Sequence, residues 1–181
     1  MRRASTGLVA ALLAATACSG TEAGPSSQAQ APATNPLANY EPTAEERTGA
    51  VATLQKLFDA LEAGDAALLR SVVDPSVVMH FSETRDGQTT SGSATLDALA
   101  DRITGSDVPL IERMWNPVVA VSGSLATIWT PYDFYVGPDF SHCGVDTANL
   151  LHDENGWTIV ALSWTRLQPP ACDLHPEGPP T

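Results

Sequence analysis

Three ionisable side chains stand in surroundings that could suit general acid–base catalysis. His80 lies in a run of β-branched and apolar residues, Asp133 lies between two aromatic residues, and Asp146 lies near the start of another strand-like stretch. Burial among apolar side chains can shift the pKa of such a group to the value that a general base needs. Tyr132 or Tyr135 could then donate a hydrogen bond to an oxyanion. His80, Asp133 and Tyr132 are therefore the candidate catalytic residues.

Each candidate also has a purely structural explanation. His80 can lie on the solvent face of its strand, and Asp146 can serve a turn after Gly144. Strand alternation puts Ile128, Thr130, Tyr132 and Phe134 on one face, and Trp129, Pro131, Asp133 and Tyr135 on the other. The first face is the more apolar, so we expect it to be core. Asp133 is then expected on a solvated or interfacial face.

Motifs for metals, nucleophiles and cofactors are missing from the sequence. His142 and Cys143 are adjacent, so a strand would point them to opposite faces, and the other histidines show no ligand-like spacing. No nucleophilic serine motif, phosphate-binding loop or dinucleotide glycine pattern occurs. The sequence therefore predicts no metal site and no cofactor.

Tryptophan is frequent for a domain of this size, with four in the chain. Trp115 and Trp129 lie on neighbouring predicted strands and could pair across them. Together with Tyr132 and His80, they are the candidate ligand-binding residues for a small apolar or aromatic molecule. The alternative is that the tryptophans belong to the core or to an interface on the sheet face.

The first residues have the order of a bacterial export signal. Two arginines precede an apolar run, Gly7–Ala17, which is too short to span a membrane as a helix. Ala15–Cys18 resembles a lipobox, with alanine where leucine is usual. We predict a lipoprotein signal peptide over residues 1–17 and a lipid on Cys18, although ordinary secretion after the same cut is the alternative. Ser19 favours the outer membrane of the cell envelope, facing the periplasm.

The charge of the chain excludes several kinds of partner. Signal removal takes two of the nine basic residues and none of the 21 acidic ones, which leaves a formal charge of −14. Binding to nucleic acid needs clustered lysine and arginine, so a nucleic-acid partner is not expected. Docking on an anionic lipid surface is disfavoured for the same reason. The predicted membrane contact is through the lipid anchor alone.

Two cysteines remain once Cys18 is assigned to the lipid. An even pair in an oxidising compartment favours a disulfide, here between Cys143 and Cys172. Two buried free thiols are the alternative. The stretch 18–42 is rich in small residues, glutamine and proline, which predicts the lipidated cysteine followed by a flexible linker.

The domain is expected over residues 43–176, with a disordered tail at 177–181. Apolar residues at helical spacing predict helices over 44–63, 66–73 and 94–103, opened by capping residues Thr43, Asp65 and Ser93. Period-two or β-branched stretches predict strands over 76–82, 110–121, 125–136, 144–152 and 157–167. Three helices and a mostly antiparallel set of strands indicate an α+β fold.

The order of these elements resembles the nuclear-transport-factor-2-like family, which is also called SnoaL-like. Leu57–Asp65 is similar to the opening helix of that family and its exit, and Ile128–Tyr135 to its long central strand. Phe140–Asp146 and Asn155–Val160 resemble its last two strands. Exported bacterial members described as lumazine-binding are the nearest subgroup. The resemblance implies a cone-shaped, curved antiparallel sheet wrapped around the N-terminal helices, with a pocket at its wide end.

Members of that family include isomerases, cyclases and dehydratases, and also binding domains without chemistry, so the fold does not decide function. The leading hypothesis is an exported, lipid-anchored module that binds a small apolar or aromatic molecule or a protein partner without catalysis. The first alternative is an isomerase-, cyclase- or dehydratase-type enzyme with a pocket His or Asp as base. The second alternative is a structural domain that forms a homodimer through the sheet face.

Overall fold

A computed structural model describes residues 37–180 of the chain. The predicted signal peptide, Cys18 and most of the predicted linker lie outside these residues. Within them, the last part of the linker contains a short 3-10 helix, η1, at Ala38–Tyr40, which contacts strand β4, Val118–Ser122. No helix in residues 37–180 is long and apolar enough to cross a membrane.

The first helix, α1, spans Ala44–Ala63 and begins and ends at the predicted residues. Thr43 and Glu46 form the expected capping box, in which the Thr43 Oγ1 accepts from the Glu46 amide and the Glu46 carboxylate accepts from the Thr43 amide. Gly64 ends the helix with a φ of 64°, a left-handed conformation that favours glycine. Its buried face includes Leu54, Leu57, Phe58 and Leu61.

Two shorter helices also begin at residues whose side chains cap the first backbone amides. Helix α2, Ala66–Val72, begins after Asp65, whose carboxylate accepts from two backbone amides. Helix α3 runs over Leu96–Thr104 and is capped by Thr95 rather than by Ser93. The predicted start at 94 was wrong because residues 93–95 belong to a strand.

Seven strands form one sheet in the order β2-β1-β7-β6-β5-β3, with β4 also paired to β5. Their bounds are β1 Val78–Arg85, β2 Gln88–Thr95, β3 Leu110–Met114, β4 Val118–Ser122, β5 Leu125–Val136, β6 Asp139–Asp153 and β7 Gly156–Arg166. All neighbours are antiparallel except β1 and β7, which are parallel. The predicted α+β class and mostly antiparallel sheet are confirmed, and the sheet is mixed through this one pair.

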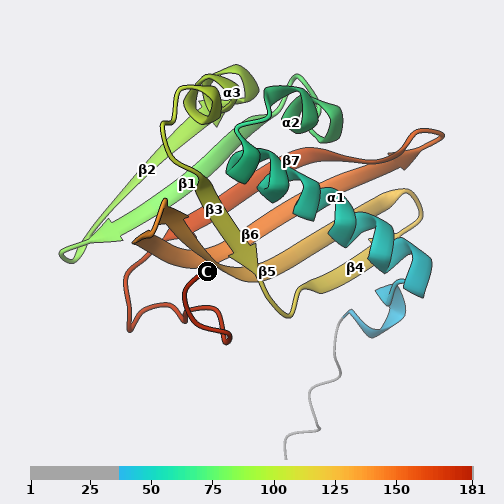
Figure 1. Cartoon of the computed structure of the whole chain (residues 1–181). Helices are drawn as coiled ribbons and strands as arrows, with labels where there is room; N and C mark the ends of the chain where they lie inside the picture. Colours follow the sequence, from blue (N-terminus) through green and yellow to red (C-terminus); the bar gives the residue numbers. More distant parts are fainter. Residues whose placement is uncertain (1–36, 181) are drawn as a thin grey trace, which may run out of the picture. The chain divides into compact units, whose positions relative to one another are not determined.

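The sheet curves around α1, while α2 and α3 lie at one end of it (Figure 1). Helix α1 packs against β3, β5 and β7. Register shifts between Phe134 and Tyr135 on β5, and between Asn149 and Leu150 on β6, mark bulges in the β5–β6 and β6–β7 pairings. Bulges increase local bending, so they help the long strands to wrap around the helix.

Two sequence predictions of strands were incomplete. Strand β2 was not predicted, because Gln88–Thr95 is made of small polar residues without apolar alternation. The predicted strand 110–121 is two strands, since Asn116 has a φ of 49° and is followed by Pro117, which interrupts the pairing. Strand β5 matches its predicted bounds, and β6 begins five residues earlier than predicted.

The two faces of the sheet have different coverings. The inner face meets the helices and forms the core with Ile128, Tyr132, Ala148 and Leu150. On the outer face, Cys143 of β6 is joined to Cys172, so the predicted disulfide is present. The segment after β7 is thereby held to the sheet, and it bonds further to β6 through Leu167.

Candidate functional site

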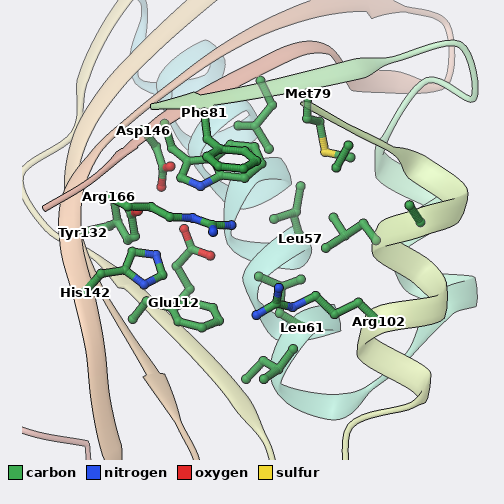
Figure 2. Close-up of a pocket in the computed structure, with 17 residues that line it drawn as sticks. Leu57, Leu61, Met79, Phe81, Arg102, Glu112, Tyr132, His142, Asp146 and Arg166 are labelled. Carbon is green, nitrogen blue, oxygen red and sulfur yellow. The ribbon is translucent and has the colours of Figure 1, made fainter. Parts of the chain in front are cut away.

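A cavity of about 300 Å³ lies between the inner face of the sheet and helices α1 and α3. Its lining is mainly apolar, with Leu57 and Leu61 from α1, Met79 from β1 and Leu162 from β7. This volume falls at the small end of ligand pockets, which run from about 300 to 1,000 Å³. Figure 2 shows Glu112, Tyr132, His142, Asp146 and Arg166 on the sheet side of the cavity, and Arg102 on the helix side.

Two carboxyl groups from different strands meet in this cavity. Glu112 comes from β3, and Asp146 comes from β6, where alternation turns both side chains to the inner face. The two carboxyls are hydrogen-bonded to each other. Asp146 is 2% exposed, and no N–H or hydroxyl group of the described residues bonds to its Oδ2 atom. A bond between two carboxyls needs a proton on one of them.

The proton of this pair is held at neutral pH. Burial, the nearby Glu112 charge and the hydrogen bond between the two groups raise the pKa of Asp146 well above its usual range. Asp146 is therefore the protonated member and donates to Glu112. Burial raises the pKa of Glu112 to about 7, although that hydrogen bond and the Arg166 charge act to lower it. Glu112 thus changes charge near physiological pH.

Arg166, at the end of β7, brings a positive charge to the same cavity. Its guanidinium lies 4.2 Å from the centre of the Phe81 ring and 5.7 Å from that of Trp164. Phe81 and Trp164 stack with ring centres 5.5 Å apart, so the two rings together form the aromatic surface that the Arg166 guanidinium packs against. The ion-pair distance from Arg166 to Glu83 is a long 4.0 Å.

His142 and Tyr132 complete the polar lining. The His142 ring stacks on Phe134 at 4.9 Å, and its Nδ1 lies 2.9 Å from the Ser141 hydroxyl. Burial and the neighbouring arginine charges lower the pKa of His142 to about 4, so the ring is neutral at pH 7. Tyr132 donates its hydroxyl proton to the Thr165 carbonyl oxygen at 2.7 Å, and burial raises its pKa far above the usual range.

Comparison by sequence finds no matching family model and no similar curated protein. Comparison by structure does find matches. An NTF2-like protein of unknown function from Shewanella baltica OS155 shares 20% identity with a TM-score of 0.51, over 68% of this chain and 96% of that one. An NTF2-like superfamily protein from Salmonella enterica shares 13% identity with a TM-score of 0.57, over 71% of this chain and 96% of that one.

A third structure, an NTF2-like protein with a cystatin-like fold from Novosphingobium aromaticivorans, shares 15% identity with a TM-score of 0.53. It aligns over 70% of this chain and 85% of its own. The fold is NTF2-like. This confirms the fold that the sequence resemblance implied. At such identities the likeness concerns the fold alone, and NTF2-like proteins must have their functions argued from their sites.

The NTF2-like sheet places His80 away from the cavity. His80 is exposed on β1, between Met79 and Phe81, which both line the cavity. Because side chains alternate along a strand, the His80 side chain lies on the outer face of the sheet. Among the candidates from sequence, Tyr132 and Asp146 are the two that line the cavity. Asp146 lies within β6 rather than in a turn.

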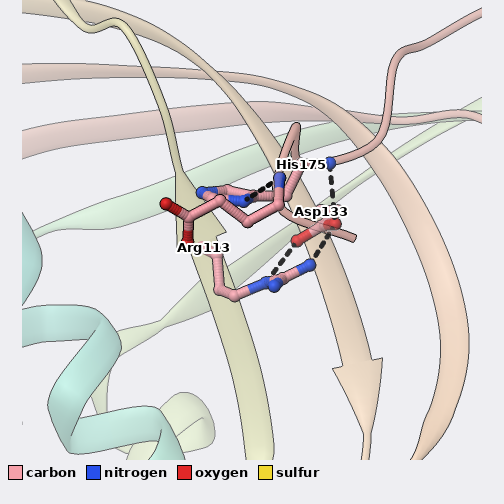
Figure 3. A network of polar contacts seen from close by, with 4 residues as sticks. Arg113, Asp133 and His175 are labelled. Atoms are coloured by element: carbon pink, nitrogen blue, oxygen red, sulfur yellow. Dashed lines mark hydrogen bonds and ion pairs between the residues drawn. The ribbon is translucent and has the colours of Figure 1, made fainter. Parts of the chain in front are cut away.

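Asp133 lies on the outer face, as alternation predicted, but it is fully buried there rather than solvated. Its two carboxylate oxygens accept from Arg113 at 3.0 and 2.7 Å, and Oδ2 also accepts from the His175 amide at 3.0 Å (Figure 3). The C-terminal segment thus covers Asp133, and this is why the predicted solvent contact is missing. The bidentate pair joins β3 to β5, and the bond from the His175 amide fastens the C-terminal segment to the same carboxylate.

The tryptophan candidates also lie outside the cavity. Trp115 is partly buried against the His175 ring, at 5.4 Å between centres, and Trp129 is 49% exposed beside Val118. Trp115 and Trp129 are therefore not partners across strands. Exposed Leu125 and Leu151 are paired on the same outer face. A homodimer through this face stays a prediction.

Glu112 and Arg166 were missed in the sequence, although a signal for each exists. Glu112 stands between Leu110 and Met114 at a spacing of two, so it continues the core-facing set of its strand. Arg166 continues the set of Leu162 and Trp164 in the same way. A charged residue at a core-facing strand position is a candidate for a cavity. No group of three or more His, Cys, Asp or Glu in residues 37–180 is arranged to hold a metal ion.

Proposed function

We propose that this NTF2-like domain binds one small, mainly apolar molecule in the cavity between its sheet and its helices. The observation that carries the proposal is the apolar cavity of about 300 Å³, whose polar wall is the hydrogen-bonded pair Glu112 and Asp146. Pockets of this kind, apolar with a few converging polar groups, are the usual binding sites of small ligands.

Unsatisfied polar atoms add to this argument. Arg166 Nε is buried without a hydrogen-bond partner among the described residues, and the buried Asp146 Oδ2 accepts from no N–H or hydroxyl group there. A buried polar atom without a partner costs about 1–3 kcal/mol. A ligand with a polar group could supply partners and so gain affinity from the same atoms.

The test uses N-phenyl-1-naphthylamine, a neutral dye that fluoresces in apolar surroundings. We expect the dye to bind with a blue-shifted emission. Ala98 is exposed where α3 borders the cavity, so Ala98→Trp should block entry and weaken binding at least about tenfold, as loss of 1.4 kcal/mol does. Ala67→Trp, on the exposed side of α2 and away from the cavity, is the matched control. Equal binding by Ala98→Trp would refute the cavity as the site.

Proton transfer is a second candidate function, and the pKa of Glu112 near 7 is the observation that favours it. An ionised Glu112 could take a proton from a carbon next to a carbonyl group, with Asp146 as the neighbouring acid. His80 and Asp133, the bases considered from sequence, lie on the other face. The reaction class would still be that of isomerases, cyclases or dehydratases.

Hydrogen exchange tests this second candidate. In D₂O, the wild-type domain should catalyse deuterium entry into the methyl group of 2-acetonaphthone, followed by NMR, and Glu112→Gln should not. Exchange at the buffer rate with wild-type protein, measured while the ketone is shown to be bound, would exclude Glu112 as a base. The domain would then be a binding module without catalysis.

The cellular setting is also a proposal. We propose that the chain is exported and that a lipid on Cys18 holds the domain at the periplasmic side of the outer membrane. The order of the first residues and the Cys143–Cys172 bond support it, because disulfides persist in oxidising compartments. Labelled palmitate should enter the wild-type chain in bacteria and not Cys18→Ala. Incorporation into that variant would refute the anchor.

A further inference from the structure

Positive charge is concentrated in the cavity of a strongly acidic protein. The chain has nine basic residues against 21 acidic ones, and yet two arginines, Arg102 and Arg166, line this one cavity. Basic side chains in an acidic protein are usually drawn to nearby carboxylates on the surface. Arg70, for example, pairs with Asp97 at 2.7 Å. Among residues 37–180, neither cavity arginine has an ion-pair partner closer than 4.0 Å.

The positive charge of Arg166 is only weakly balanced by nearby acidic groups. Its side chain is 23% exposed, its ion-pair distance to Glu83 is 4.0 Å, and its buried Nε has no hydrogen-bond partner among residues 37–180. Arginine stays charged in proteins, so this is a permanent cation. The guanidinium rests on the Phe81 ring, and Arg166 lines the cavity.

Arg102 lies at the cavity edge, in the last turn of α3. In the described part of the chain, its side chain enters none of the ion pairs. Figure 2 shows Arg102 reaching from the helix side toward the polar wall, where Arg166 lies opposite. The two charges act on each other, since the Arg102 charge contributes to a lowered pKa of Arg166. An anion between them would relieve this repulsion.

The negative charge of Glu112 and Asp146 does not balance the positive charges of both arginines. Because Asp146 holds a proton, Glu112 and Asp146 together carry at most one negative charge at neutral pH. His142 is neutral. The side chains that line the cavity therefore carry two permanent positive charges and at most one negative charge, and Glu83, outside the lining, offsets Arg166 only from 4.0 Å.

We infer that the ligand is a small carboxylate, an anionic group on a compact aromatic or branched aliphatic body, and that Arg166 and Arg102 hold the anionic group. This inference rests on the proposed binding function and specifies its ligand class. Guanidinium groups bind carboxylates through charge-assisted hydrogen bonds, which are about twice as strong as neutral ones. The apolar body would lie against Leu57, Leu61 and Leu162.

The experiment compares 2-naphthoate with 2-naphthamide, which have the same ring system and differ in charge, by calorimetry on the intact domain. We expect the wild type to bind the carboxylate about tenfold or more tightly than the amide, as one added charged hydrogen bond would give. Arg102→Gln and Arg166→Gln should bring this ratio toward one. Arg102 is exposed on its helix, so its replacement leaves folding intact even if Arg166→Gln does not.

Arg85→Gln is the matched control, because Arg85 is an exposed arginine near the same end of the sheet that does not line the cavity. It should leave the ratio unchanged, whereas an equal loss in Arg85→Gln would mean general attraction and would overturn the inference. If N-phenyl-1-naphthylamine binds in the cavity but naphthoate binds no more tightly than naphthamide, the carboxylate inference fails and the binding function stands. If the dye does not bind either, the binding function itself fails.

Discussion

Replacement of Glu112 by glutamine should change how the stability of the domain depends on pH. Burial raises the pKa of Glu112 from 4.5 to about 7, so the folded state binds this proton more tightly than the unfolded chain. The stabilising contribution is complete below pH 4.5 and is lost as the pH rises through 7. At about 1.4 kcal/mol per pKa unit, this one group lowers the free energy of unfolding by about 3 kcal/mol between pH 4 and pH 8.

Urea unfolding, followed by tryptophan fluorescence from pH 5 to pH 8.5, measures this effect. We expect Glu112→Gln to be more stable than the wild type at pH 8 and to lose most of that advantage at pH 5. The groups that act on Glu112 are kept in the variant, namely Asp146 through its hydrogen bond and Arg166 and Asp133 through their charges. Glu154→Gln, at an exposed turn position, is the control and should follow the wild type.

A stability difference that did not depend on pH would contradict the raised pKa of Glu112. If the difference in unfolding free energy between wild type and Glu112→Gln were the same at pH 5 and at pH 8, Glu112 would titrate alike in the folded and unfolded states. The raised pKa would then be wrong, and with it the shared proton of the acidic pair and the base role proposed for Glu112.

Three further substitutions test the framework around the cavity. Asp133→Asn leaves Arg113 without its carboxylate and should cost about 3 kcal/mol in urea unfolding, with unchanged affinity for N-phenyl-1-naphthylamine. Cys172→Ala removes the disulfide, whose cysteines are 29 residues apart, and should lower the free energy of unfolding by about 3–4 kcal/mol. A reducing agent should have no further effect on the stability of this variant. Gly144→Ala would place a Cβ onto the Thr165 carbonyl oxygen and should therefore displace β7. A crystal structure of the variant should show that the 2.7 Å hydrogen bond from the Tyr132 hydroxyl to that oxygen is lost. An unshifted β7 would contradict this.

Local patterns predicted the parts of the fold that local interactions determine. The Thr43 capping box and the alternation along β5 needed no distant partner, and both were read correctly. Strand β2 had a local signal as well, since Asp86-Gly87 has the positive φ values, 52° and 75°, of a two-residue hairpin turn. The turn at Gly87 was predicted, but the polar residues after it lack the apolar alternation that predicts a second strand.

The candidate site could not be assembled in the same way. Glu112 and Asp146 meet because β3 and β6 both flank β5, and Arg166 joins them because β7 is the next strand in the sheet. These neighbours are 34 and 20 residues apart in the chain, so periodicity within one strand says nothing about their contact. Asp133 shows the same limit, because its burial depends on a C-terminal segment that the disulfide holds in place.

Strands β5 and β6 alternate between two unrelated tasks, and this bears on how such a domain can diverge. Tyr132 faces the cavity while its neighbour Asp133 fastens the C-terminal segment, and His142 and Cys143 divide in the same way. Evolution can therefore replace the inward residues and change the ligand while Asp133 and the disulfide still hold the C-terminal segment on the outer face. Libraries that vary only the cavity-lining positions, with side chains of similar volume, should yield folded members at high frequency, which makes this domain a tolerant scaffold for new binding specificities.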